Sequence, residues 1–149
     1  MKKQRFKFLV AVHAFFIQEN EVLLLERANS GYMDGFYSVP AGHVDGGESI
    51  VEAMRREVRE EVGIKLSDGL EPAHVMHRLI SNDEERIDYF FVIESWTGNP
   101  KNNELHKCAG ISWHHHHQLP ENTVPYIKFA FANILEKKGF SEFDEIVTG

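Results

Sequence analysis

The sequence predicts an α/β fold, namely an α/β/α sandwich in which a mixed β-sheet lies between helices. Two segments, residues 50–62 and 125–138, have the apolar spacing and end signals of amphipathic helices. Six other segments are rich in β-branched and aromatic residues, as strands are. With 149 residues, 42% hydrophobic and 26% charged, the chain can enclose one good core. We therefore expect a single domain over residues 1–149.

The expected strands lie before, between and after the two helices. The first is long and apolar, and a turn at Glu19-Asn20 separates it from the second. Residues 81–84, Ser-Asn-Asp-Glu, form a turn between two strand-like runs, which predicts a β-hairpin. We expect residues 141–149 to form a flexible acidic tail. The predicted strands cover residues 6–17, 22–26, 37–39, 73–80, 86–96 and 111–114.

Both predicted helices carry signals at their ends. Ser49 and Glu52 form a capping box at the start of the first helix. Gly63 can adopt the left-handed conformation that ends it. The second helix has Thr123 as its candidate cap and closes before Gly139.

One face of the first helix gathers carboxylates beside its apolar stripe. Rotating each residue by about 100° places Glu57, Glu60 and Glu61 within an arc of roughly 100°. These like charges repel one another, whereas Mg²⁺ or Mn²⁺ prefers oxygen ligands and would reverse the sign. A Glu-rich helix is more often only a solvated face, so the surrounding motif decides between the two interpretations.

The helix belongs to a longer motif that runs from Gly42 to Ile64. Its pattern is Gly-x5-Glu-x7-Arg-Glu-U-x-Glu-Glu-x-Gly-U, where U is an aliphatic residue. A chance match in a chain of this length is on the order of one in 10^5 or rarer. The motif resembles, without a departure, the signature of the Nudix hydrolases.

The resemblance implies the Nudix fold, with the motif as a loop, helix and loop beside the sheet. It also implies cleavage of the pyrophosphate bond in a nucleoside diphosphate linked to a group X, by in-line attack of water. Glu60 is our first candidate for the base, and Arg56 would orient the glutamates by pairing with Glu48 or Glu60. The implied ligands of Mg²⁺ or Mn²⁺ are Glu57, Glu60, Glu61 and the carbonyl of Gly42.

Four residues outside the motif are candidates for contacts with the substrate or the metal. Arg27 ends a strand beside a glycine-containing loop, where a cation can meet phosphate oxygens. By resemblance to MutT-like members, Asn122 would read a purine edge, although it can equally be a turn residue. Tyr37 could stack on a base or pack on the core. Glu104, in a loop, is an additional candidate ligand or base.

The leading substrate is a nucleoside triphosphate, including oxidised purine triphosphates, cleaved to a monophosphate and pyrophosphate. ADP-ribose and dinucleoside polyphosphates are the alternatives. Leu79 stands where ADP-ribose subgroups often have a proline, and Ile80-Ser81-Asn82 lacks the tyrosine common in dinucleoside polyphosphate enzymes. A non-catalytic nucleotide-sensing module is a further alternative, but such domains usually lose glutamates that are all present here.

The composition of the chain indicates which binding partners and which cellular compartment to expect. A formal net charge of −7 argues against polymeric nucleic acid as a partner. Cys108 is the only cysteine, which favours a reducing cytoplasm. The basic and apolar start imitates a signal peptide, but no small-residue cleavage site follows, so a buried strand fits better and no membrane partner is expected.

Two further features leave alternatives open. A homodimer is common in the family, but a monomer fits the sequence equally well. The run from His114 to His117 could bind metal adventitiously. Because consecutive residues of an extended segment alternate sides, we expect a partly exposed polar segment there.

Overall fold

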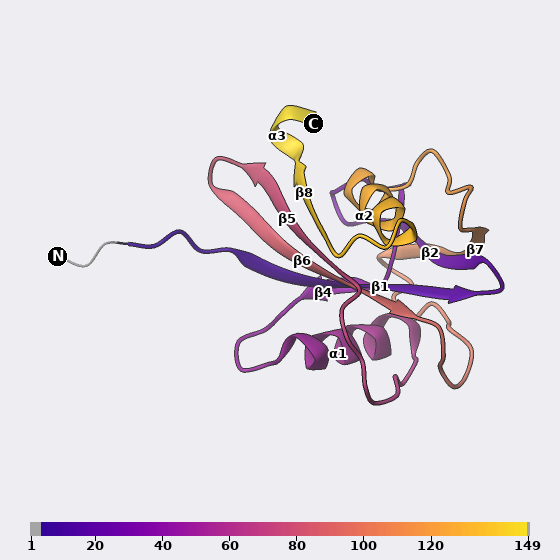
Figure 1. Cartoon of the computed structure of the whole chain (residues 1–149). Coiled ribbons are helices and arrows are strands. Elements are labelled where there is room, and N and C mark those ends of the chain that lie inside the picture. Colours follow the sequence, from indigo (N-terminus) through magenta and orange to yellow (C-terminus); the bar gives the residue numbers. More distant parts are fainter. Residues whose placement is uncertain (1–3, 149) are drawn as a thin grey trace.

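A mixed β-sheet lies between two helices in the computed structural model, which describes residues 4–148. Helix α1 (Ile50–Val62) covers one face of the sheet and helix α2 (Pro125–Leu135) lies on the other (Figure 1). A short third helix, α3 (Glu145–Thr148), follows the last strand. The predicted α/β sandwich with a mixed sheet is confirmed.

The sheet combines parallel and antiparallel neighbours around the long first strand. Its order is β3-β2-β1-β6-β5-β8, with β4 also paired to β1 and β7 to β2. The pairs β1·β6 and β5·β8 are parallel and the other pairs are antiparallel. The strands are β1 (Leu9–Gln18), β2 (Glu21–Arg27), β3 (Tyr37–Ser38), β4 (Ala41–His43), β5 (His74–Ser81), β6 (Glu84–Ile93), β7 (Cys108–His115) and β8 (Phe140–Asp144).

Alternation along β1 divides the core into two clusters. Val12, Ala14 and Phe16 belong to the cluster that packs against α1. Phe15 belongs to the cluster that packs against α2. Because successive strand residues point to opposite faces, the polar residue His13 lies on the α2 side with Phe15.

Helix α1 begins and ends at the predicted residues. The Ser49 side chain accepts a hydrogen bond from the backbone N–H of Glu52, at 3.1 Å. Gly63 has φ +71° in the left-handed region, and its N–H donates to the carbonyl of Arg59. Both capping predictions for α1 are confirmed.

The second helix departs from its prediction at both ends. Its N-cap is Val124, which makes no capping hydrogen bond through its side chain. The predicted cap was wrong, since the Thr123 hydroxyl instead donates to the carbonyl of Pro120. The helix ends at Leu135, three residues early, and Lys137 there takes a positive φ of 62°.

Two strands were not predicted. Residues 140–144 form β8, which includes the first residues of the tail expected from residue 141, and pair with β5 from Val75↔Phe140 to Leu79↔Asp144. Strand β4 pairs with β1 through only three residues. Gly149, the last residue of the expected tail, lies outside the described residues.

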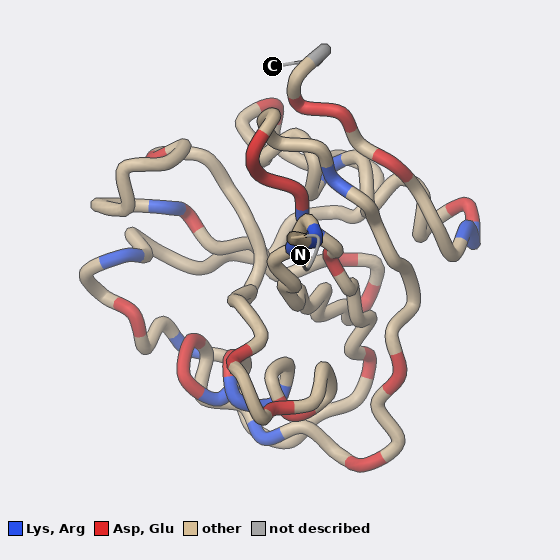
Figure 2. Tube along the Cα trace, turned by 90° about the vertical axis from the view of Figure 1, so that its left-hand side faces the viewer, with Lys and Arg blue, Asp and Glu red and all other residues tan. Residues whose placement is uncertain are grey.

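Charged residues of both signs are spread around the molecule. Figure 2 shows acidic and basic positions interspersed along the trace, without a continuous basic stripe across the described residues. None of the helices within residues 4–148 is long and apolar enough to cross a membrane.

Candidate active site

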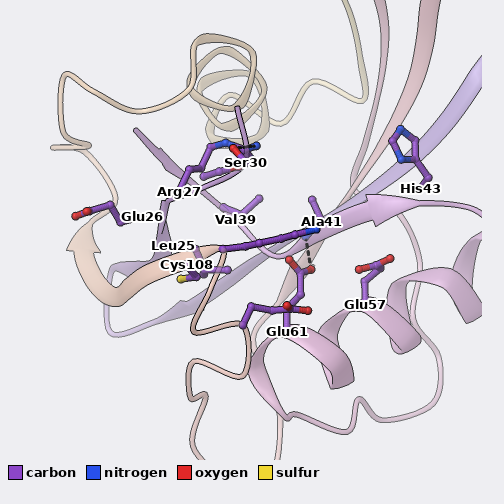
Figure 3. A pocket seen from close by; sticks show the side chains of 13 residues that line it. Leu25, Glu26, Arg27, Ser30, Val39, Ala41, His43, Glu57, Glu61 and Cys108 are labelled. Atoms are coloured by element: carbon purple, nitrogen blue, oxygen red, sulfur yellow. Dashed lines mark hydrogen bonds between the residues drawn. The ribbon is translucent and has the colours of Figure 1, made fainter. Parts of the chain in front are cut away.

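Two glutamates of α1 line a cavity of about 410 Å³ between the helix and the strands. Glu57 and Glu61 lie on its helix side, as Figure 3 shows. Glu104, from the loop before β7, and Arg27, at the end of β2, also line it. The fold therefore brings the carboxylates of α1 and of the loop before β7 into one cavity, together with the positively charged side chain of Arg27.

The inner carboxylates favour a proton or a metal ion over the free charged state. Burial, together with the neighbouring charge of Glu57, raises the pKa of Glu61 to about 9. Burial also raises the pKa of Glu57. The backbone N–H of Ala41 donates to Glu61 Oε2 at 2.9 Å and orients that carboxylate (Figure 3).

Arg56 connects the motif glutamates to one another. Its guanidinium donates to both oxygens of Glu48, at 2.6 and 2.9 Å. Nη1 donates to Glu57 Oε1 at 2.7 Å and lies 3.4 Å from Glu60 Oε2. This hydrogen bonding to Arg56 lowers the pKa of Glu48 to about 2. Both pairings considered for Arg56, with Glu48 and with Glu60, are present.

The missing side chain at Gly42 makes room for Glu57. A Cβ atom placed on Gly42 would overlap the Glu57 carboxylate. Gly42 lies in β4 opposite Val12 of β1, so its backbone has little freedom to move away. Position 42 therefore requires glycine, because the Glu57 carboxylate lies too close to its backbone for a Cβ atom.

The third helix glutamate lies apart from the other two. The Glu60 side chain is 51% exposed and does not line the cavity, although it remains next to Arg56. Within residues 4–148, no group of three or more metal-binding side chains is drawn together. The donors that are present, two adjacent carboxylates with raised pKa values, suit a hard divalent cation.

Arg27 is held at the cavity by the loop that follows it. Its Nε donates to the carbonyl of Tyr32 at 2.8 Å and Nη2 donates to Ser30 Oγ at 3.1 Å. The register between β2 and β7 shifts between Glu26 and Arg27. Such irregularities redirect side chains next to functional sites.

A family model described as the NUDIX domain matches residues 7–132. The chain belongs to the Nudix family. The motif resemblance is therefore confirmed by a match that covers most of the chain.

Three proteins illustrate which relatives this Nudix chain has. It is 42% identical over 55 residues to the human 8-oxo-dGDP phosphatase NUDT18, and 38% identical over 55 residues to an ADP-ribose pyrophosphatase of Methanocaldococcus jannaschii. Each of these matches covers 37% of the chain, but only 17% of the human and 32% of the archaeal protein. It is 30% identical over 98 residues to the 8-oxo-dGTP diphosphatase of Escherichia coli, which covers 63% of the chain and 71% of that protein.

A solved structure supports the fold of this Nudix chain. The MutT NUDIX hydrolase from Burkholderia pseudomallei superposes with a TM-score of 0.77 at 23% identity. The match covers 85% of this chain and 97% of that one.

Two predicted substrate contacts lie away from the carboxylate cavity of this Nudix protein. The Tyr37 ring packs edge-on against His114, with centroids 5.2 Å apart. Asn122 Nδ2 donates to the carbonyl of Gly35 at 2.9 Å, as a loop-bracing residue would. Neither side chain lines the carboxylate cavity.

A second cavity, on the α2 side of the sheet, was not predicted from the sequence, and His13 and Tyr126 contribute to its lining. One signal was available, because His13 is a lone polar residue at an inward position of an apolar strand. Its partner Asp88 is 75 residues away, and only pairing of β1 with β6 brings the two together.

Proposed function

We propose that this Nudix protein hydrolyses the pyrophosphate bond of a nucleoside diphosphate linked to X, with a nucleoside triphosphate as substrate. The products would be a nucleoside monophosphate and pyrophosphate. One observation carries the proposal: Glu57, Glu61 and Arg27 line the same cavity. Carboxylates that can hold a cation, beside an arginine that can bind phosphate, suit a polyphosphate chain.

The carboxylates of α1 would hold Mg²⁺ or Mn²⁺. The proposed ligands are Glu57, Glu60, Glu61 and the carbonyl of Gly42, of which Glu57 and Glu61 line the cavity. When bound, such a cation neutralises the charge that develops on the phosphate oxygens.

The chain's own residues supply the remaining functions. Arg27 would bind phosphate oxygens, and Arg56 would keep Glu57 and Glu60 in place. We assign the base to Glu104, because it lines the cavity whereas Glu60 does not. Glu104 would take a proton from water as the water oxygen attacks phosphorus and the pyrophosphate leaves from the opposite side.

The relatives support a nucleotide substrate without selecting one. Two are named for 8-oxo-dGDP and 8-oxo-dGTP and one for ADP-ribose, and each of these compounds contains a nucleoside diphosphate. The net charge of −7 and the interspersed charges support a small molecule rather than a nucleic acid polymer. The single cysteine, Cys108, is buried, and we propose a cytoplasmic location on this basis.

Release of phosphate or pyrophosphate from a nucleotide panel tests the proposal. The native protein with Mg²⁺ or Mn²⁺ is compared with Glu57→Gln, Glu60→Gln and Glu104→Gln. We expect each substitution to lower kcat by about 100-fold or more, and Glu104→Gln to leave stabilisation by Mg²⁺ intact.

Glu52→Gln, on the exposed side of the same helix, is the matched control and should retain the native rate. No turnover of any member of the panel would contradict hydrolysis. Nucleotide binding without turnover would instead indicate the sensing module.

A further inference from the structure

Glu104, the proposed base, lies in a loop and not on a helix or a strand. Residues 94–107 join β6 to β7, and Glu104 is half-buried where it lines the carboxylate cavity. A base must stay within hydrogen-bond reach of the proton that it takes. The contacts that hold Glu104 in this loop therefore bear on the reaction.

Backbone hydrogen bonds attach the loop to the end of α1. The N–H of Lys101 donates to the carbonyl of Val62 at 3.1 Å. The N–H of Asn103 donates to the carbonyl of Glu61 at 3.0 Å. Both carbonyls belong to the last turn of the helix, where they have no partner within the helix itself. The loop is thus tied to a residue whose side chain lines the same cavity as Glu104.

The backbone of Glu104 is held at both of its polar atoms. Its carbonyl accepts from the N–H groups of Lys107 and Cys108, at 2.9 and 2.8 Å. Its own N–H donates to the side-chain oxygen Oδ1 of Asn102 at 2.9 Å. The carbonyl is therefore held by main-chain atoms, whereas the N–H is held by one side chain.

The side-chain amide of Asn102 connects two parts of the cavity wall. While Oδ1 accepts from Glu104, Nδ2 donates to the carbonyl of Cys108 at 2.7 Å. Cys108 begins β7 and lies opposite Arg27 of β2. Cys108 and Arg27 both line the carboxylate cavity, whereas Asn102 does not. Because one end of the amide must accept and the other must donate, the half-buried side chain has a single orientation.

We propose that Asn102 is a positioning residue for the hydrolysis, whose side-chain amide fixes Glu104 relative to Arg27 and so sets where the base stands against the bound phosphate. Asn102 would act only through Glu104, because it does not line the cavity itself. The benefit to the base rests on the proposed function. The placement of Glu104 by Asn102 does not rest on it.

Backbone dynamics of the metal-free protein test the placement without any reaction. The ¹⁵N order parameter of the Glu104 N–H is compared in the native protein, Asn102→Ala and Asn99→Ala. Asn99 is the matched control, because it lies in the same loop but is exposed and does not line the carboxylate cavity. We expect about 0.85 in the native protein and in Asn99→Ala, and about 0.6 or less in Asn102→Ala. Equal values in the two variants would overturn the inference.

Steady-state hydrolysis tests whether the placement serves the base. Asn102→Ala should lower kcat by about 10-fold to 100-fold and change KM by less than about twofold, because a displaced base costs rate and not substrate binding. Asn102→Ser should recover kcat to within about fivefold of the native value, since a serine hydroxyl can accept from the same N–H. A rise in KM at unchanged kcat, or a serine variant as slow as alanine, would overturn the inference.

A double substitution separates an effect through Glu104 from general damage to the loop. In Glu104→Gln the base is already absent, so adding Asn102→Ala should lower kcat by less than about twofold more. An equal loss in both backgrounds would show that Asn102 does not act through Glu104. Stabilisation by Mg²⁺ should persist in Asn102→Ala, and its loss would show that the substitution disturbs the carboxylates of α1 instead.

The outcomes for the inference and for the proposed function differ. If no nucleotide is hydrolysed but the order parameter of Glu104 falls in Asn102→Ala, the proposed function fails and the placement of Glu104 remains. If nucleotides are hydrolysed and Asn102→Ala keeps the native kcat, the hydrolase remains and the inference fails.

Discussion

The Glu57 carboxylate fills space that only glycine at position 42 leaves free. Arg56 holds the same carboxylate from the other side, through a hydrogen bond of 2.7 Å. The position of one proposed metal ligand is therefore set by two residues of its own motif. At this scale, the fixed spacing of the motif reflects contact distances and not only helical periodicity.

Gly42→Ala should inactivate the protein without unfolding it. The added methyl group would displace Glu57, and a displacement of about 1 Å at a catalytic group can cost about 100-fold in rate. Steady-state hydrolysis and the melting temperature measure the two effects separately. Gly110→Ala is the control, because a Cβ atom there meets nothing within 4 Å. Equal rates for the two variants would show that Glu57 can adapt.

Helix α1 is the element that the sequence specifies best. Its start at Ser49, its end at Gly63 and its apolar stripe are signals that act within a few residues. The buried residues Ala53, Met54, Val58 and Val62 hold it on the sheet. The proposed metal ligands therefore depend on the stability of this one helix.

Ser49→Ala should destabilise α1 through the lost cap. Loss of a hydroxyl that accepts from the Glu52 N–H costs about 1 kcal/mol, or roughly 2–4 °C in melting temperature at this chain length. Thermal unfolding followed by circular dichroism measures it. Ser49→Asp can still accept that hydrogen bond and should melt close to the native protein. A drop of the same size in both variants would argue against capping as the cause.

Other elements were beyond sequence reasoning because they depend on distant partners. Strand β4 has three residues with glycine in the middle, so it shows no apolar alternation and exists through pairing with β1. Strand β8 likewise depends on β5, some 65 residues earlier in the chain. The site divides in the same way. The α1 glutamates, placed by local periodicity, were found, whereas His13 and Asp88 meet only in the folded sheet.

At the scale of the whole molecule, ionisation of Glu61 in the metal-free protein lowers the stability of the fold, and a bound cation would offset this cost. Glu61 has a pKa of about 9 in the folded state against an ordinary value of 4.5. Between these values the folded state holds a proton that the unfolded state has released. The stability of the metal-free protein should therefore fall as pH rises from about 4.5 to about 9.

Melting curves of the metal-free protein and of Glu61→Gln, at about pH 5 and about pH 8, test this effect. We expect the native protein to lose roughly 10 °C more than the variant over that interval, because glutamine does not titrate. Mg²⁺ should stabilise the native protein more at the higher pH, since it binds the ionised carboxylate, and should have little effect on the variant. Parallel pH profiles for the two proteins would contradict the assignment.

Strand β8 connects the last described residues of the chain to the wall of the second cavity. It lies against β5, the strand that carries Arg78, and leads directly into Glu145, which pairs with that arginine (Figure 1). A chain cut before Phe140 would keep every residue of the motif yet lose Glu145 from the lining of the second cavity. Arg78 would then keep Asp88 as its carboxylate partner but lose Glu145, so that the residues around the second cavity could change in evolution while the motif stays the same.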